Sequence, residues 1–369
     1  MTLSDYERKE WDRLHKRKSA ALGNKARHLL PAAARNRVSV AVDAVRQRAP
    51  GADAVAGAYA SGAKEFGNII GRVASHTVST ESVVKQFRDA GYEVDALGCI
   101  HHFDLEEVDS VARWDRIRHR QAGMAALSGV AFAGAITGAE ALLLKGTVAG
   151  GGAKKAPQFG IVATAFAADV ASVLGLAART VASTAQYYGY DPRQPEEQVF
   201  MMSVLSLGMA AGTQAKAAAY AELSQLTQLL FRNAAWDKLN KKVLTKIAQQ
   251  FATKFGVALT KKKLGQVVPV VGMAVGGVLN FALIGRIAEA ANDAYRERFL
   301  IERSGGELSA PIYGVEAPSR SDDNAIGLIE LLQEEDALPS LDLGDTLSAE
   351  DGQARPSAAR SERRHPFRG

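Results

Sequence analysis

A short polar turn between two long alanine-rich apolar segments constrains this chain most. The turn runs from Tyr187 to Glu197 and contains Gly189 and Pro195. Glycine readily adopts the left-handed conformation that ends many helices, and proline suits the first turn of a helix, where its missing N–H would have no partner. Glu196 and Glu197 then place negative charge at the positive end of the helix dipole. The segment therefore predicts two helices that meet at a sharp turn.

Four stretches have nearly the length that crosses a bilayer, which is about 20 residues. They are Gln121–Ala139, Gln158–Ala178, Gln198–Ala215 and Leu264–Gly285, and Asp169 is their single charged residue. An integral membrane protein with several spans is one interpretation. Alanine and glycine, however, favour insertion far less than leucine or phenylalanine, and the mean hydropathy of the chain is −0.08. We predict an all-α fold, a bundle of long Ala/Gly-rich helices.

Composition divides the chain into three parts. Residues 1–49 form a basic helical N-terminal arm, which is typical of a solvated helix or a surface-binding segment. Residues 50–304 form the helical domain. Residues 305–369 are acidic and then arginine-rich, a composition typical of disorder. Within this disordered tail, residues 324–333 have the pattern of a short helix that docks on a protein partner or on its own chain.

A strongly basic stretch lies before the last apolar segment. Residues 232–263 contain nine Lys/Arg and one acidic residue, and their apolar side chains recur at helical spacing. Such a helix suits an anionic membrane surface, but it is equally typical of a core-packed helix with solvated lysines. The lysines predicted to face the anionic surface are Lys238, Lys241, Lys242, Lys246, Lys254, Lys261, Lys262 and Lys263.

The histidines near residue 100 are weak candidates for a metal-binding site. Cys99, His101, His102 and Asp104 lie close together in sequence, but adjacent histidines do not easily bind one ion, and no second Cys/His pair stands at zinc spacing. We therefore expect a loop followed by a helix that Asp104 and Glu107 cap, with neither metal nor cofactor. A single cysteine excludes an internal disulfide and favours the cytoplasm, and no secretory signal is visible at residue 1.

A second set of polar residues lies in or near the apolar helices. Asp169 is expected to pair with Arg179 or Arg286, because a charge in an apolar helix is usually paired or functional. The full candidate polar cluster is Asp169, Arg179, Tyr187, Tyr190, Asp191, Glu196, Glu197, Asn280 and Arg286.

The order of several motifs resembles the EcsC protein family. Asp169 and Arg179 precede the run from Ala185 to Asp191, AQYYGYD, and a helix with the sequence FMMSVL follows. The sequence PVVG and then Ala294-Tyr295-Arg296 come far downstream. The resemblance covers roughly residues 50 to 300. It implies an all-helical fold and brings no defined reaction with it.

These patterns favour binding over catalysis. We expect a non-enzymatic accessory protein at the inner face of the plasma membrane, with an anionic lipid surface as partner. The alternative is an enzyme that acts on a lipid-like or other small substrate through Asp169 and the 187–197 turn, although the chain lacks GxSxG, P-loop, HExxH and dinucleotide-binding motifs. Nucleic-acid binding is not expected, because no known DNA- or RNA-binding motif accompanies the basic helix. The sequence does not indicate an oligomeric state.

Overall fold

The computed structural model describes residues 2–23, 79–127, 156–210, 212–232, 236–263, 272–308 and 327–337, and it leaves out the side chains of 156–170, 237 and 256–279. Every regular element in these ranges is helical, which confirms the predicted all-α fold. The elements are α1 (Asp5–Gly23), α4 (Thr80–Asp89), η1 (Leu97–His102), α5 (Leu105–Ala112), helix 114–127, α7 (Ala156–Tyr187), α8 (Pro195–Met209), α9 (Thr213–Phe231), η2 (Trp236–Lys238), α10 (Lys241–Lys263), α11 (Gly272–Arg303) and α12 (Leu328–Glu334).

The polar turn predicted from the sequence is present between α7 and α8. Helix α7 ends at Tyr187, Gly189 follows with φ of 90°, and α8 begins at Pro195. Gly189 is needed for a second reason, because a Cβ at this position would lie 2.9 Å from Nε2 of His101. The turn thus brings α8 back against α7 and against the 97–102 segment.

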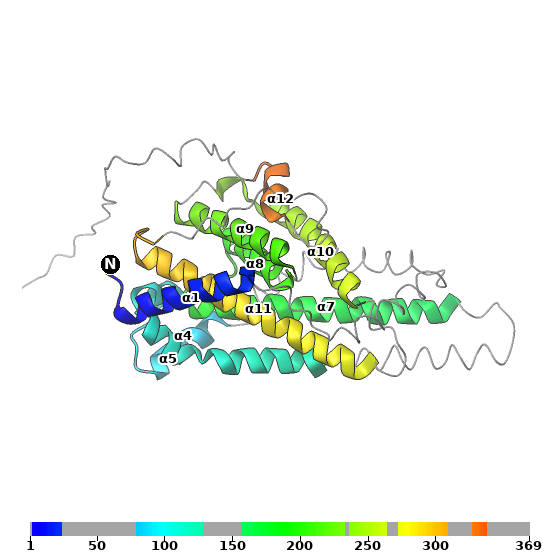
Figure 1. Cartoon of the computed structure of the whole chain (residues 1–369), viewed down its shortest axis with the longest axis horizontal. Coiled ribbons are helices and arrows are strands. Elements are labelled where there is room, and N and C mark those ends of the chain that lie inside the picture. Colours follow the sequence, from blue (N-terminus) through cyan, green and yellow to red (C-terminus); the bar gives the residue numbers. More distant parts are fainter. Residues whose placement is uncertain are drawn as a thin grey trace, which may run out of the picture.

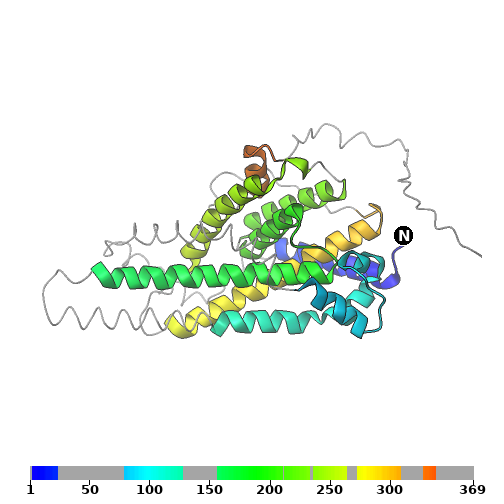
Figure 2. The ribbon, with the colours of Figure 1, turned by 180° about the vertical axis from the view of Figure 1, so that it is seen from behind.

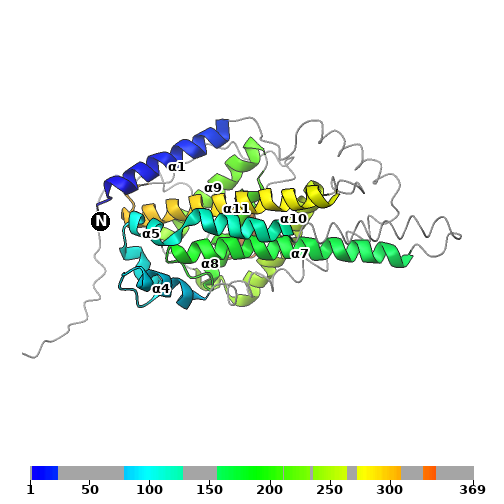
Figure 3. The ribbon, with the colours of Figure 1, turned by 90° about the horizontal axis from the view of Figure 1, so that it is seen from below.

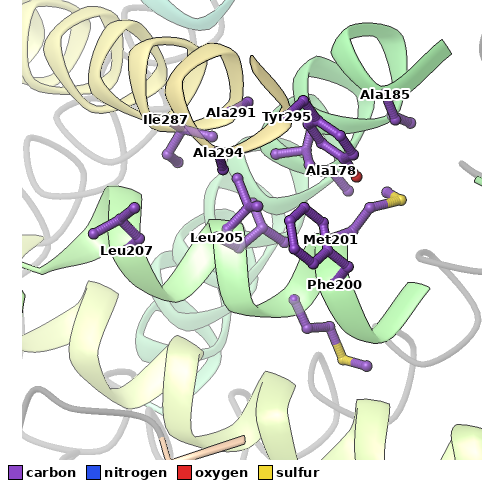
Figure 4. Packing of buried hydrophobic residues seen from close by; sticks show 14 of the residues in the cluster. Ala178, Ala185, Phe200, Met201, Leu205, Leu207, Ile287, Ala291, Ala294 and Tyr295 are labelled. Carbon is purple, nitrogen blue, oxygen red and sulfur yellow. The ribbon is translucent and has the colours of Figure 1, made fainter. Parts of the chain in front are cut away.

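Helix α11 lies at the centre of the bundle and packs chiefly against α7 and α8. Figure 4 shows Phe200 and Leu205 of α8 facing Tyr295 of α11, with Ala178 of α7 beside them. The small side chains of α7 let the large ones of its neighbours approach closely, as the alanine-rich composition predicted.

Other helices cover this centre on separate sides. Helix α1 crosses α11 and also contacts α5 and α9. Helices α9, α10 and α12 lie on one side of α11, and α4, α5 and helix 114–127 lie on the other (Figures 1 and 2).

The stretch Gln198–Ala215 shows why the length of an apolar segment does not identify a membrane-spanning helix in this chain. It comprises most of α8, in which every residue from Val199 to Met209 is buried, and the first residues of α9, which begins at Thr213. Its apolar side chains therefore face protein on all sides. Within the described ranges, no helix is both long enough and apolar enough to cross a membrane. Part of the stretches Gln121–Ala139 and Leu264–Gly285 lies outside those ranges.

The predicted capping box of α5 is confirmed. The Asp104 carboxylate accepts a hydrogen bond from the backbone N–H of Glu106 at 2.9 Å, and the Glu107 carboxylate accepts one from the N–H of Asp104 at 2.8 Å. This cap fixes where α5 begins and so where Asp109 stands, one helical turn later.

The close contact between Gly208 of α8 and Ile287 of α11 provides a test of helix packing. A Cβ added to Gly208 of α8 would lie 2.9 Å from the backbone Cα of Ile287 and closer still to its side chain. Because backbone cannot move aside cheaply, we expect Gly208→Ala to lower the free energy of unfolding by about 1–3 kcal/mol.

Gly175→Ala in α7 is the matched control, since nothing lies within 4 Å of the Cβ that it adds. It should stabilise the protein by roughly 0.5–1 kcal/mol through helix propensity. Urea denaturation of both variants measures the difference, and equal stabilities would contradict the close α8–α11 contact.

Candidate functional site

The C-terminal half of α11 carries the densest set of buried charges in the described part of the chain. Arg296, Glu297 and Arg298 are each less than a tenth exposed. Buried charges are costly unless they are paired and hydrogen-bonded. The partners of these three side chains come from α1, α5, α8 and the turn between α7 and α8, so they show how the bundle is held together.

Arg298 joins α8 to α11. Its Nη1 lies 2.7 Å from Oε2 of Glu197, and its Nε lies 2.8 Å from Oε1 of Glu302. The hydroxyl of Tyr295 donates to the other Glu197 oxygen at 2.5 Å, and that of Tyr190 donates to Glu302 at 3.0 Å. The guanidinium also stacks 3.9 Å above the Tyr190 ring. We call these five residues the Arg298 cluster.

The neighbouring carboxylates keep the guanidinium group of Arg298 positively charged. Burial by itself would lower the pKa of Arg298, but the carboxylate of Glu197, followed by Tyr190 and Glu302, outweighs burial and raises it. Burial is also the main reason that the pKa values of Tyr190 and Tyr295 lie well above the ordinary value for tyrosine. Both tyrosines therefore remain neutral donors.

Arg296 forms a second cluster that joins α1 and α5 to α11. Its two terminal nitrogens lie 2.6 Å from Glu10 and 2.6 Å from Asp109. Its Nε donates to the hydroxyl of Tyr188 at 3.2 Å, and that hydroxyl donates to Asn292 at 2.9 Å. We call Glu10, Asp109, Tyr188, Asn292 and Arg296 the Arg296 cluster.

Helix α1 is not merely a solvated arm. Glu7 is fully buried, pairs with Arg303 and accepts a hydrogen bond from the N–H of Leu105 at 3.2 Å. Lys18 is 2% exposed and pairs with Glu297. Since these contacts reach α5 and α11, α1 packs as part of the bundle over residues 5–23.

The structure brings two members of the candidate polar cluster, Tyr190 and Glu197, to Arg298. Asp191 instead pairs at the surface with Arg193, two residues away, at 2.7 Å. Glu196 is half-buried in the first turn of α8. The hydroxyl of Tyr187 donates to Gln86 of α4 at 2.7 Å. The 187–197 turn is therefore a junction whose side chains point to different neighbours.

The remaining members lie farther along the apolar helices. Asn280 is buried. Nε of Arg179, and Nε and Nη2 of Arg286, are buried without a hydrogen-bond acceptor in the described part of the chain, and burial lowers the pKa of Arg286. The side chain of Asp169 lies outside the described residues, so its pairing with either arginine stays a prediction.

The histidine segment packs against the turn. The ring of His101 makes an edge contact with Tyr190 at 4.7 Å between ring centres, and burial lowers the pKa of this histidine. Within the described ranges, no three Cys, His, Asp or Glu side chains are grouped as ligands of a metal ion.

Helix α10 buries its apolar face in the protein. Ile247, Phe251 and Phe255 are fully buried, so the core-packed alternative describes this helix. Lys241, Lys242, Lys246 and Lys254 of this helix are exposed, as is Lys238 just before it. The side chains of Lys261, Lys262 and Lys263 lie outside the described residues.

The tail segment 327–337 docks on its own chain. Leu328, Leu331 and Leu332 of α12 are buried against α8 and α10. Glu335 pairs with Lys246 at 2.7 Å, and Asp336 pairs with Lys238 at 3.2 Å. Helix α12 is thus ordered where the sequence predicted a disordered tail. Residues 309–326 and 338–369 of that tail lie outside the described residues.

Glu222 of α9 holds the start of α12. One of its oxygens accepts a hydrogen bond from the N–H of Leu328 at 2.6 Å, and Ser203 donates to the other at 3.3 Å. Burial raises the pKa of Glu222 to about 7, although the N–H groups of Leu328 and Ile329 oppose the shift.

Sequence reasoning missed most of the charged residues that join the helices, namely Glu7, Glu10, Lys18, Asp109, Arg296, Arg298 and Glu302. A signal for Arg298 does exist, because Tyr295, Arg298, Phe299 and Glu302 share the i, i+3, i+4, i+7 spacing of one helix face. An arginine on a face with two aromatic residues indicates a buried charge that needs an acidic partner.

Taken together, the described fold is a strandless helical bundle in which most buried charges serve packing. A model of the EcsC protein family matches residues 3–300, and the chain belongs to this family. The match starts within the first residues of the chain and so includes α1.

Two relatives from Bacillus subtilis (strain 168) are similar to part of this chain. The uncharacterized protein YdbA is 34% identical over 139 residues, which are 37% of this chain and 48% of YdbA. Protein EcsC is 25% identical over 138 residues, which are 37% of this chain and 52% of that protein. The matched stretch thus covers about half of each relative. No solved structure matches the chain significantly.

The Arg298 cluster gives a stability prediction. Arg298→Met leaves the carboxylate of Glu197 buried without its cation, so we expect it to lower the free energy of unfolding by about 3–5 kcal/mol. Arg193→Met removes the exposed pair with Asp191 and should change stability by less than about 1 kcal/mol. Urea denaturation compares the two variants, and a small loss for Arg298→Met would show that Glu197 is not held by this pair.

Glu222 gives a pH prediction. The pKa of this carboxyl group is raised on folding, so its contribution to stability is complete below its unfolded value, near 4.5, and is lost as the pH rises through about 7. Glu222→Gln removes the titrating group and keeps an acceptor for Leu328. We expect wild type to lose up to about 3 kcal/mol relative to this variant between pH 4.5 and pH 8, measured by urea denaturation. Parallel pH profiles would contradict the assignment.

Proposed function

We propose that the chain is a non-enzymatic accessory protein that docks on the anionic inner face of the plasma membrane through the lysines of α10. One observation carries the proposal: Lys241 and Lys242 are exposed on one helix and have no acidic partner among the described residues. Each lysine near an anionic bilayer contributes about 1 kcal/mol.

The contact is electrostatic and involves no insertion by the described part of α10. Its aromatic residues, Phe251 and Phe255, are fully buried in the protein and are not free to enter lipid. Binding through lysines alone is weak and sensitive to salt, because exposed charges are screened beyond about 8 Å at physiological ionic strength.

The docked tail supports the proposal. Glu335 and Asp336 already pair with Lys246 and Lys238, which shows that this face accepts carboxylates of the same chain. An anionic membrane would compete with these two acids for the same cations.

The enzyme alternative has less support from the geometry. Both oxygens of Glu197 are engaged, one by Tyr295 and one by Arg298, and its side chain is 4% exposed. A carboxylate in this position has no free lone pair directed at solvent, whereas a general acid or base must reach the proton that it transfers.

Vesicle flotation tests the membrane contact. We expect the purified protein to float with phosphatidylglycerol vesicles at low salt, not with neutral vesicles, and to be released at roughly 1 M salt, where charges are screened beyond about 3 Å. Lys241→Glu/Lys242→Glu should abolish flotation, and Glu335→Gln/Asp336→Asn should strengthen it, because the latter frees Lys246 and Lys238.

Lys9→Glu/Lys16→Glu is the matched control, since it reverses two exposed lysines of α1. This variant should float as wild type does. Equal loss in both double variants would mean that net charge alone matters, and undiminished flotation of Lys241→Glu/Lys242→Glu would overturn the role of α10.

A further inference from the structure

A groove lies between α4, α5, helix 114–127 and the end of α7, on the side of the bundle away from α10 and α12 (Figure 1). It encloses about 480 Å³, which is within the usual range for small-molecule sites. Its lining includes three arginines, Arg113, Arg116 and Arg120. Figure 3 shows the elements that form it, seen from below.

The three arginines of the groove are uncommitted. All are exposed, and no hydrogen bond or ion pair involves their side chains in the described part of the chain. Arg118, on the same helix, differs from them, because it lies 2.5 Å from Glu289 of α11. Arg118 therefore ties helix 114–127 to the bundle, while the three arginines that line the groove have no ion-pair partner among the described residues.

Asp89, the acidic residue that lines the groove, does not neutralise the three arginines. Asp89 lines the groove but lies 2.6 Å from Lys85, one helical turn earlier. The groove therefore carries an excess of positive charge, held by planar guanidinium groups that suit bidentate binding of phosphate oxygens.

The position of Arg113 is unusual. It is the single residue between α5 and helix 114–127 and has φ of 45° and ψ of 57°, the left-handed conformation. This conformation costs a non-glycine residue roughly 1–2 kcal/mol. A glycine would avoid the cost, whereas arginine places a third guanidinium at the mouth of the groove.

Part of the groove wall is apolar, and its hydroxyl groups are not available as hydrogen-bond donors to a ligand. Val111, Ala112 and Ile117 contribute apolar surface. The hydroxyl of Tyr187 donates to Gln86 and Ser110 donates to the carbonyl oxygen of Glu107, so neither hydroxyl proton is free for a ligand. Recognition of an anion thus falls to the guanidinium groups, beside a surface that suits the less polar part of the same ligand.

We propose that this groove binds a phosphate-bearing ligand through Arg113, Arg116 and Arg120. The ligand is a small phosphorylated molecule or the headgroup of a phospholipid, and both present the same phosphate oxygens to the arginines. The site is separate from the lysines of α10 and does not depend on the proposed membrane contact.

Isothermal titration calorimetry with inorganic pyrophosphate tests the first source. We expect saturable binding to one site at physiological salt. Arg116→Gln/Arg120→Gln should weaken it by about tenfold or more, the loss of at least one charge-assisted hydrogen bond. Asp89→Asn should tighten it, because this change removes the acidic group from the lining. Lys241→Gln/Lys242→Gln, which removes two charges from α10, should bind as wild type does.

Flotation with phosphatidic acid vesicles tests the second source. It is carried out in the Lys241→Glu/Lys242→Glu background, so that the contribution of α10 is absent. Flotation that Arg116→Gln/Arg120→Gln abolishes supports the site with a lipid headgroup as its ligand. Absence of binding in both experiments, or binding that the arginine changes leave unaltered, overturns the proposal. Circular dichroism confirms that the variants fold, as expected for exposed residues.

Discussion

The buried pair between Arg298 and Glu197 is the interaction on which the described bundle depends most. It places a full positive and a full negative charge at the contact of α8 with α11, where neither is stable alone. Tyr190, Tyr295 and Glu302 complete the hydrogen bonds of both charges. Because each partner lies on a different part of the chain, the pair fixes how the 187–197 turn sits against α11.

The Arg296 cluster extends the same principle to the N-terminal helix. Glu10 and Asp109 reach Arg296 from α1 and α5, and Lys18 reaches Glu297. One stretch of α11 therefore positions α1, whose Glu10 lies 286 residues from Arg296 in the sequence. Specific orientation is a reasonable role for such pairs, since their net contribution to stability is often small compared with apolar packing.

Charges that the bundle does not use for packing gather at two surfaces. The lysines of α10 and the arginines of the groove are exposed, and most of them have no partner among the described residues. The two surfaces differ in form, because the lysines lie along one helix and the arginines line a groove between several helices. An extended anionic surface suits the lysines of α10, and a compact anion suits the arginine-lined groove. We therefore assign different partners to the two surfaces.

Local sequence patterns determined the secondary structure and several of its boundaries. Gly189 and Pro195 set the turn, and Asp104 with Glu107 set the start of α5, because helix ends depend on residues within a few positions of each other. The 3.6-residue spacing of Ile247, Phe251 and Phe255 showed which face of α10 is apolar. It did not show whether lipid or protein covers that face, since both are apolar environments.

The sequence by itself thus determined an all-α chain, its main turn and the amphipathic character of α10. Only the tertiary structure decided that α10 packs on the core, that Tyr190 and Glu197 meet Arg298, and that Arg113, Arg116 and Arg120 surround one groove. These facts depend on contacts between residues far apart in the chain. The helix face of Arg298 indicates a buried charge, but the local sequence does not identify Glu197 as its partner, because the fold brings that carboxylate from about 100 residues away.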